Sequence, residues 1–313
     1  MFLKSSYQAI FGGIHMKTAT QKRTDLRALL SGGKIVVVPG IGDALAAKIA
    51  QAAGIRCVAM GGYSVTAVHL AQPDVGLLSM KEMALALKEI CDATDIPVIA
   101  DGDNGYGNAL NVIRTEYEFE KAGASCIFFE DQVWPKRCGH MDGKQVITVD
   151  EHVQKIRAAV DNRIDKETII MARTDSRAVY GIEDAIERCK RYADAGAEML
   201  FADGLCTREE IERFAKELGG SGAFLDANMI EGGKTPIIPA KELEQMGYSV
   251  VFWACSAVYT VTKALYDLFS GLKANGTTEA TLSQMIAFGK FNHFIGLDHY
   301  KDLERKYKVD RDD

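Results

Sequence analysis

Acidic side chains follow two apolar segments of the sequence, at the points where those segments end. Asp101 and Asp103 come directly after one apolar run, and Glu130 follows the next. In an extended backbone, residues two positions apart place their side chains on the same side. Carboxylates held close together repel one another unless a cation lies between them, and hard oxygen ligands suit Mg²⁺ or Mn²⁺. We therefore predict a divalent metal site, the alternative being a glycine-rich turn whose aspartates make only local hydrogen bonds.

Cys138 lies in a polar loop with Lys136, Arg137 and His140 as close neighbours in the sequence. Positive charge beside a thiol lowers its pKa and makes the sulfur a better base or nucleophile. The sequence therefore predicts a catalytic role for Cys138 with His140 beside it, although His140 could also be a loop histidine without a role. Most of the other six cysteines lie in apolar runs or helical stretches, where they are interpreted as small hydrophobic residues.

Candidate substrate-binding groups follow other apolar runs. The backbone amides of Gly61 and Gly62 are unobstructed by side chains and could hold a carboxylate or an oxyanion, although a tight turn needs the same glycines. Arg173 can bind a carboxylate through two hydrogen bonds, or it could form a structural ion pair with Asp175. Asn228 adds an amide group after the seventh run. Acids, an arginine, an amide and a thiol are thus all expected at one place.

The elements that would position these residues are eight short apolar runs separated by helical stretches. The runs cover residues 35–38, 56–60, 97–100, 125–129, 168–172, 199–202, 223–225 and 249–253. They lack a period-2 alternation, which is typical of strands buried on both faces of a parallel sheet. Eight such units over about 250 residues predict a (β/α)8 TIM barrel, whose active site forms at the C-terminal ends of the strands. The alternative, an open doubly wound sheet, usually carries a full GxGxxG turn after its first strand, and the sequence lacks it.

The predicted organisation is an N-terminal arm at 1–24, the barrel at 25–257 and a C-terminal helical extension at 258–313. The extension is expected to contain two helices, near 258–275 and 278–307. A barrel needs no such addition to close, so we expect these helices to make contacts in an oligomer. Asp74 lies between the second and third runs, where it could cap a helix or lie behind the metal ligands.

Composition excludes several classes of function. A formal net charge of −6 gives no general attraction for nucleic acid or an anionic membrane surface, and no apolar run reaches the roughly 20 residues of a membrane span. Seven cysteines without a CxxC pair indicate a reducing compartment, so a cytoplasmic location is expected. The first 24 residues carry four basic side chains and no acidic one, which leaves organelle import as an alternative.

Four motifs in this order resemble the isocitrate lyase/phosphoenolpyruvate mutase superfamily, and in particular its lyase branch with dimethylmalate lyase and methylisocitrate lyase. The motifs are DGDNGYGN (101–108), FFEDQVWPKRCGH (128–140), ARTDS (172–176) and NMIEGGKTP (228–236). The resemblance runs from about Arg23 to the C-terminus. It implies a (β/α)8 barrel whose last helices are swapped between subunits, in a homotetramer.

The same resemblance implies roles for individual residues. Mg²⁺ would be held near Asp101 and, partly through water molecules, near Asp74, Asp103 and Glu130. A small α-oxo or α-hydroxy acid would be bound by Gly61, Gly62, Tyr63, Asp101, Arg173 and Asn228. Cys138 would protonate the enolate that remains after C–C cleavage, and its loop would gate the site.

These implications predict a Mg²⁺-dependent oxo-acid lyase that cleaves a small 2-hydroxy or 2-oxo dicarboxylate and releases pyruvate or a similar oxo acid. Residues 141–144 read Met-Asp-Gly-Lys where methylisocitrate lyases usually have Arg-Pro-Asn-Lys, which argues against a tricarboxylate substrate. The carboxyphosphonoenolpyruvate mutase subgroup keeps a similar cysteine loop, so P–C bond chemistry is one alternative and oxaloacetate hydrolysis is another. A non-catalytic barrel without Mg²⁺ affinity is a third.

Overall fold

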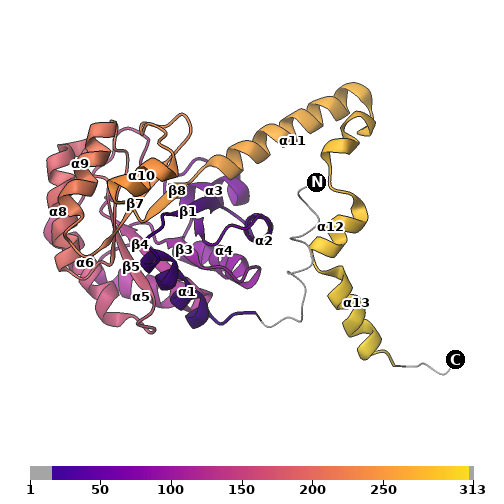
Figure 1. The fold of residues 1–313 in the computed structure, drawn as a ribbon, viewed down its shortest axis with the longest axis horizontal. Helices are drawn as coiled ribbons and strands as arrows, with labels where there is room; N and C mark the ends of the chain where they lie inside the picture. Colours follow the sequence, from indigo (N-terminus) through magenta and orange to yellow (C-terminus); the bar gives the residue numbers. More distant parts are fainter. Residues whose placement is uncertain (1–15, 310–313) are drawn as a thin grey trace. The chain divides into compact units, whose positions relative to one another are not determined.

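The computed structural model describes residues 16–309, and most of them belong to a closed barrel of eight parallel strands surrounded by helices (Figure 1). The strands pair in sequence order, and the last strand pairs with the first. They are β1 (Val36–Ile41), β2 (Val58–Met60), β3 (Val98–Asp101), β4 (Cys126–Glu130), β5 (Ile169–Thr174), β6 (Met199–Ala202), β7 (Phe224–Met229) and β8 (Val250–Trp253). Each overlaps one of the eight predicted runs, so the predicted TIM barrel is confirmed.

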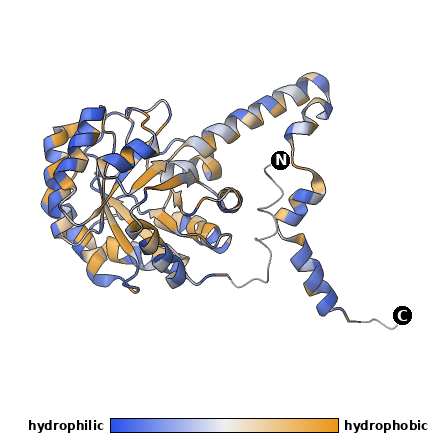
Figure 2. Cartoon of the chain, in the orientation of Figure 1, coloured by the Kyte–Doolittle hydropathy of each residue, from blue (hydrophilic) through white to orange (hydrophobic). Residues whose placement is uncertain are grey.

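One helix precedes the first strand, and the others connect successive strands and cover the outside of the barrel. They are α1 (Ala19–Ser31), α2 (Ala44–Ala52), α3 (Gly62–Leu70), α4 (Met80–Asp92), α5 (Ala109–Ala122), α6 (Val149–Asn162), α7 (Arg177–Tyr180), α8 (Ile182–Asp194), α9 (Arg208–Leu218) and α10 (Ala240–Met246). Several begin with a side-chain cap, as in α4, where the Ser79 hydroxyl accepts a hydrogen bond from the backbone N–H of Glu82 and the Glu82 carboxylate accepts one from the backbone N–H of Ser79. Polar residues on the helices face outward while the strands are mostly apolar (Figure 2).

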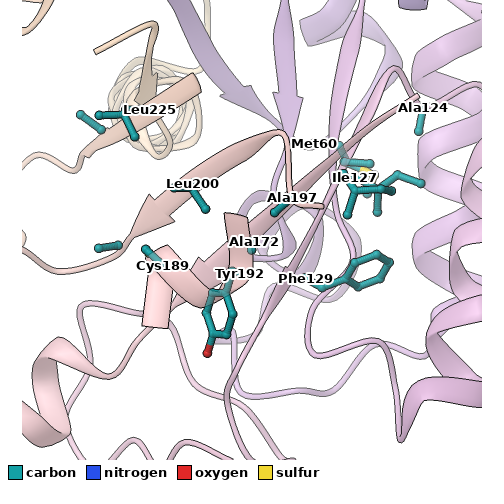
Figure 3. Close-up of a cluster of buried hydrophobic side chains, with 14 of the residues drawn as sticks. Met60, Ala124, Ile127, Phe129, Ala172, Cys189, Tyr192, Ala197, Leu200 and Leu225 are labelled. Atoms are coloured by element: carbon teal, nitrogen blue, oxygen red, sulfur yellow. The ribbon is translucent and has the colours of Figure 1, made fainter. Parts of the chain in front are cut away.

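Side chains on each strand alternate between the barrel interior and the helices. One core cluster contains Ile99, Phe128 and Phe201 together with alternate residues of the other strands, and forms the interior of the barrel. The other cluster packs the remaining strand residues against the helices, as Ile127 and Leu200 do in Figure 3. The alternation fixes which polar residues at the strand ends point inward.

Helix α1 closes the N-terminal end of the barrel. Leu26 and Leu30 pack with the interior cluster, and the buried Arg23 donates hydrogen bonds to the carbonyls of Ala124 and Glu120. Residues 19–24, which the sequence assigned to an N-terminal arm, are therefore the first turns of this helix. Residues 1–15 of that arm lie outside the described residues.

The C-terminal extension is helical but more broken than expected. Helix α11 (Ser256–Asn275) matches the first predicted helix, whereas the second is divided into η1 (Glu279–Gln284), α12 (Phe288–Phe294) and α13 (Leu297–Lys306). Gly296 has φ of 95°, a left-handed conformation that ends α12. The described residues up to 259 form one compact unit, and those from 260 onward belong to a second. No helix in residues 16–309 is both long and apolar enough to span a membrane.

Candidate active site

Polar residues from five neighbouring strands meet at the C-terminal end of the barrel. Asp101 ends β3, Glu130 ends β4, Arg173 is the penultimate residue of β5, Asp203 follows β6 and Asn228 lies in β7. Each continues the inward alternation of its strand, and all five are buried. Asp101, Arg173, Asp203 and Asn228 line a cavity of about 60 Å³, together with Gly61, Tyr63, Asp74 and Cys138. The structure thus brings together most of the residues that the sequence singled out.

The acidic residues of this site surround a lysine. Lys136 Nζ lies 2.7 Å from Asp74 Oδ1 and 2.7 Å from Asp103 Oδ1. Asp101 instead accepts hydrogen bonds from two backbone amides, that of Gly62 at 2.9 Å and that of Asp103 at 3.0 Å. The sequence indicated Lys136 only as a neighbour of Cys138, whereas its ammonium belongs to the acidic cluster.

Burial raises the pKa of some of these carboxyl groups, because nearby cations and hydrogen bonds do not fully stabilise their negative charge. Burial and the nearby Asp103 raise the pKa of Asp101 to about 6. Burial also raises the pKa of Glu130 well above its usual range, even though Arg173 opposes the shift. Neither Glu130 oxygen has a hydrogen-bond partner, although Glu130 Oε2 lies 3.3 Å from Arg173 Nε. Glu130 Oε1 is therefore available to accept a bond from water or to contact a cation.

The set of donor atoms suits Mg²⁺. Around the site, six buried carboxylates outnumber the three buried cations that they contact or face. The carboxylates belong to Asp74, Asp101, Asp103, Glu130, Asp175 and Asp203, and the cations to Lys136, Lys144 and Arg173. Between residues 16 and 309 no three ligand side chains already surround one point. Mg²⁺ usually keeps several waters and needs only one or two direct carboxylates, so this arrangement fits it.

The sequence left open whether Arg173 binds a substrate carboxylate or forms a structural ion pair. Its Nε donates to Asp175 at 2.9 Å, and its Nη2 lies 2.7 Å from Asp203. Its guanidinium carbon also lies 5.2 Å from the centre of the Phe201 ring. Arg173 therefore forms structural ion pairs and still lines the cavity, where a substrate carboxylate can reach it.

The environment of Cys138 corrects one sequence-based prediction. The thiol was expected to have a lowered pKa, but burial raises the pKa of Cys138 to about 11, and the His140 backbone N–H offsets this only in part. The prediction was wrong because Lys136 directs its charge at the acidic cluster rather than at the sulfur. The thiol at the cavity wall therefore carries its proton at neutral pH.

His140 holds the cysteine loop in place. Its Nδ1 accepts a hydrogen bond from the backbone N–H of Lys234 at 2.9 Å, and its Nε2 lies 3.3 Å from Asp203 Oδ1. An acceptor at Nδ1 assigns the proton of the neutral ring to Nε2. The imidazole thus joins the loop to residues that follow β6 and β7.

The glycine pair predicted to bind an anion lies at the start of α3. Gly61 is its N-cap and Gly62 its first residue, so backbone amides point from the helix N-terminus toward the site. The Gly62 amide is engaged by Asp101 in this structure. A Cβ at Gly62 would lie only 3.0 Å from Lys136 Nζ, which explains the need for glycine. Tyr63 follows on the same helix and also lines the cavity.

Three charged residues of the site were not selected as candidates from the sequence. Asp203 accepts hydrogen bonds from Asn228 at 3.0 Å and from the Gly204 amide, Asp175 holds Arg173, and Lys144 pairs with Asp175. Asp203 and Asp175 could have been found by continuing the alternate positions of β6 and β5 past the strand ends. No pattern of that kind indicates Lys144, which lies in a loop.

Comparison with known families gives one match over most of the chain. The family model described as phosphoenolpyruvate phosphomutase matches residues 26–272. The chain is 44% identical to 2,3-dimethylmalate lyase from Eubacterium barkeri, over 91% of this chain and 98% of that protein. It is 42% identical to the chloroplastic carboxyvinyl-carboxyphosphonate phosphorylmutase from Arabidopsis thaliana, over 91% of this chain and 84% of that protein.

Solved structures agree with these relatives. A crystal structure of 2,3-dimethylmalate lyase superposes with a TM-score of 0.86 and 32% identity, and the match covers 93% of this chain and 96% of that one. Phosphonopyruvate hydrolase, in a complex with oxalate and Mg²⁺, superposes with a TM-score of 0.82 and 27% identity, covering 93% and 99% of the two chains.

Proposed function

The chain belongs to the phosphoenolpyruvate mutase/isocitrate lyase superfamily, and we propose that it is a Mg²⁺-dependent lyase that cleaves a C–C bond in a small 2-hydroxy or 2-oxo dicarboxylate. The observation that carries this proposal is one cavity that is lined by Asp101, Arg173, Asn228 and the protonated thiol of Cys138. The substrate would be dimethylmalate-like or methylisocitrate-like.

Substrate binding follows from the charges in the cavity. Arg173 is the sole cation among the residues that line the described cavity, so it would hold a substrate carboxylate. Asn228 Oδ1 is buried without a hydrogen-bond partner and would accept the substrate hydroxyl. Asp101, with Asp74, Asp103 and Glu130 around it, would hold Mg²⁺, which would supply stabilisation of the negative charge that develops on the substrate oxygens.

Cleavage then follows a retro-aldol course. The 2-hydroxyl loses its proton to the acidic cluster, its carbon becomes the carbonyl of the oxo acid, and the bonding electron pair passes to the neighbouring carbon. The resulting enolate takes the proton of the Cys138 thiol. A pKa of about 11 suits Cys138 to this step, because an acid must still carry its proton at neutral pH.

The apolar part of the cavity wall indicates which substituents the substrate carries. Ile230, Phe252 and Ala254 also line the cavity, and these side chains favour short alkyl groups over a third carboxylate. This favours a dimethylmalate-like substrate over a methylisocitrate-like one, in agreement with the 44% identical relative.

Pyruvate release from 2,3-dimethylmalate and from 2-methylisocitrate, each with Mg²⁺, tests the proposal. We expect product from at least one of them, with a preference for the first, and a large loss of rate in Cys138→Ser. Absence of product from both substrates would contradict the lyase proposal.

P–C bond chemistry is the second candidate, and the 42% identical phosphorylmutase favours it. A phosphonate group brings up to two negative charges, and the cavity already has three carboxylates against the one guanidinium of Arg173. The lyase reaction therefore suits the cavity better. Phosphorus NMR of the protein with phosphonopyruvate or phosphoenolpyruvate distinguishes the two, since a mutase or hydrolase would convert the phosphorus signal.

A further inference from the structure

Lys144 is a buried lysine that the proposed reaction does not use. Its side chain is only 1% exposed. Nζ donates a hydrogen bond to Asp175 Oδ1 at 2.9 Å and a second, shorter one to the backbone carbonyl of Gly139. A buried ammonium is costly unless it is paired and hydrogen-bonded, so these two contacts decide whether Lys144 can stay inside.

The first contact connects Lys144 to the substrate-binding arginine. Asp175 holds Arg173 through two hydrogen bonds, from Nε at 2.9 Å and from Nη2 at 3.1 Å. The backbone N–H of Asp175 is fixed in turn by Asp131 at 2.9 Å. Asp203 and Glu130 also pair with Arg173, so three carboxylates compete for one guanidinium. Lys144 takes up part of the charge of Asp175 and leaves more of the Arg173 charge for a ligand.

The second contact lies within the segment that carries the thiol, which we call the thiol loop (residues 136–144). Gly139 lies between Cys138 and His140, and its backbone packs directly against the strand ends. A Cβ at Gly139 would lie 1.8 Å from Asp203 Oδ2 and 2.7 Å from Arg173 Nη2. The thiol loop is thus packed tightly over the site. Lys144 stays buried as long as the loop is closed.

We propose that Lys144 is a positioning residue that fastens the thiol loop to Asp175 and so couples closure of the loop to the orientation and charge of Arg173. If the loop opened, Lys144 would enter water, Gly139 would lose its partner and Asp175 would bind Arg173 alone. The fastening of the loop stands on the contacts alone, whereas the effect on ligand binding rests on the proposed function.

Hydrogen exchange of backbone amides, read by mass spectrometry on the protein without ligand, tests the fastening. In Lys144→Met we expect the amides of Cys138 and Met141 to exchange about tenfold faster or more, because a buried charged contact that holds the loop is lost. These amides now donate to Asp74 O and Cys138 O. Peptides from β4 and β5 should exchange at the wild-type rate. Unchanged exchange in the thiol loop would overturn the proposal.

Lys234 provides a matched control. It also pairs with a residue of the thiol loop, Asp142, but Lys234 is one-third exposed and Asp142 is 94% exposed. An exposed pair contributes little, so Lys234→Met should leave exchange of the loop unchanged. Lys144→Met could also speed exchange in the peptides from β4 and β5. In that case Lys144→Arg, which keeps the positive charge, is the variant that tests the fastening of the loop. Exchange near the wild-type rate in that variant supports the proposal, and exchange as fast as in Lys144→Met contradicts it.

Titration calorimetry with oxalate and Mg²⁺ tests the coupling to Arg173. We expect Lys144→Met to bind oxalate about tenfold more weakly and Lys144→Arg to recover most of the affinity. Equal affinity in wild type and Lys144→Met would contradict the coupling. If the wild type itself bound no oxalate, the proposed function would fail, and the exchange experiment would still decide whether Lys144 fastens the loop.

Discussion

At the scale of single residues, the reactivity of the site depends on where each charge is directed rather than on which charges are near in sequence. Cys138 has basic neighbours along the chain, yet the Lys136 ammonium contacts Asp74 and Asp103. The thiol is left in a largely desolvated position at the cavity wall, and this desolvation raises its pKa and keeps it protonated. A proton donor, and not a thiolate nucleophile, is the role this environment supports.

Replacing the thiol gives the most direct test of that role. Cys138→Ser should lower the rate of product formation by about 10²–10⁴-fold, because a serine hydroxyl is a much weaker acid. Binding of Mg²⁺ and oxalate, measured by calorimetry, should change little. Cys206→Ser is the matched control, since Cys206 is also partly exposed but makes its contact with the Gly204 carbonyl. A loss of rate in both variants would argue against a special role for Cys138.

The raised pKa of Cys138 also predicts how the thiol reacts with alkylating agents. Only the thiolate reacts, so the rate of modification by iodoacetamide should rise about tenfold per pH unit from pH 7 upward. The rise should level off near pH 11, where the thiol loses its proton. Mass spectrometry of the peptide that contains Cys138 measures the rate. A plateau already at pH 8 would show a lowered pKa, as the sequence alone suggested.

Part of the site could be read from the sequence at this scale. Asp101, Glu130 and Arg173 were identified because each ends an apolar run, and strand ends meet at one edge of a parallel barrel. The pKa of Cys138, the position of Lys136 and the contacts of Lys144 depend on how a loop folds back over the barrel. Neighbours in sequence do not determine that path, so these features needed the structure.

At the scale of elements, α1 shows how a helix outside the repeated units contributes to the core. Leu26 is fully buried against the barrel interior. Leu26→Ala should lower the free energy of unfolding by about 3 kcal/mol, because it leaves a cavity in that cluster. Urea denaturation followed by circular dichroism measures the change. Leu85→Ala on α4, where the side chain is 61% exposed, should alter stability by less than about 0.5 kcal/mol. Equal losses of unfolding free energy in the two variants would contradict the packing of α1 against the barrel interior.

Helix α5 carries a buried acid that makes stability depend on pH. Burial, together with the neighbouring Glu120, raises the pKa of Glu116 to about 9, and neither carboxylate oxygen of Glu116 has a hydrogen-bond partner. In the unfolded chain the same group titrates near 4.5. The folded state therefore keeps a proton that the unfolded state loses, and the stabilisation present below pH 4.5 declines as the pH rises toward 9.

Glu116→Gln removes this titration and should flatten the dependence of stability on pH. We expect the urea midpoint of the wild type to fall more between pH 5 and pH 8 than that of the variant. Glu118→Gln on the same helix is the control, since its hydrogen bond with Lys81 lowers the pKa of Glu118 and keeps its titration below this pH range. A wild-type protein and a Glu116→Gln variant with parallel pH profiles would contradict a neutral Glu116.

At the scale of the whole molecule, the barrel was predictable but its ends were not. The eight apolar runs and the glycines between them determine the order of strands and helices, and each predicted run falls on a strand. The first helix was cut at residue 24 because its amphipathic pattern is weak, with buried basic residues such as Arg23 on its inner face. The final helix was predicted as continuous because Gly296 alone is a modest signal for a break.

The first helix of the C-terminal extension, α11, has an exposed apolar face that predicts an oligomer. Along α11, Val261, Leu265, Phe269 and Leu272 follow one another at intervals of four, four and three residues, and each is at least 42% exposed within the chain. Such spacing puts them on one face of the helix. A continuous exposed apolar stripe is rarely left in contact with water and usually marks an interface. We therefore propose that α11 packs on another copy of the chain. The family resemblance implies that this assembly is a homotetramer with exchanged C-terminal helices.

Light scattering coupled to size-exclusion chromatography tests this assembly. The wild type should have about four times the chain mass of 34.2 kDa, and Phe269→Glu should shift it to smaller species, because a charge in a buried apolar interface is costly. Lys263→Gln lies on the opposite face of α11 and should leave the mass unchanged. Deleting the interface should also lower thermal stability in a way that depends on protein concentration. A wild-type protein that runs as a monomer at micromolar concentration would rule out an assembly built on α11, and the apolar stripe would then need another occupant.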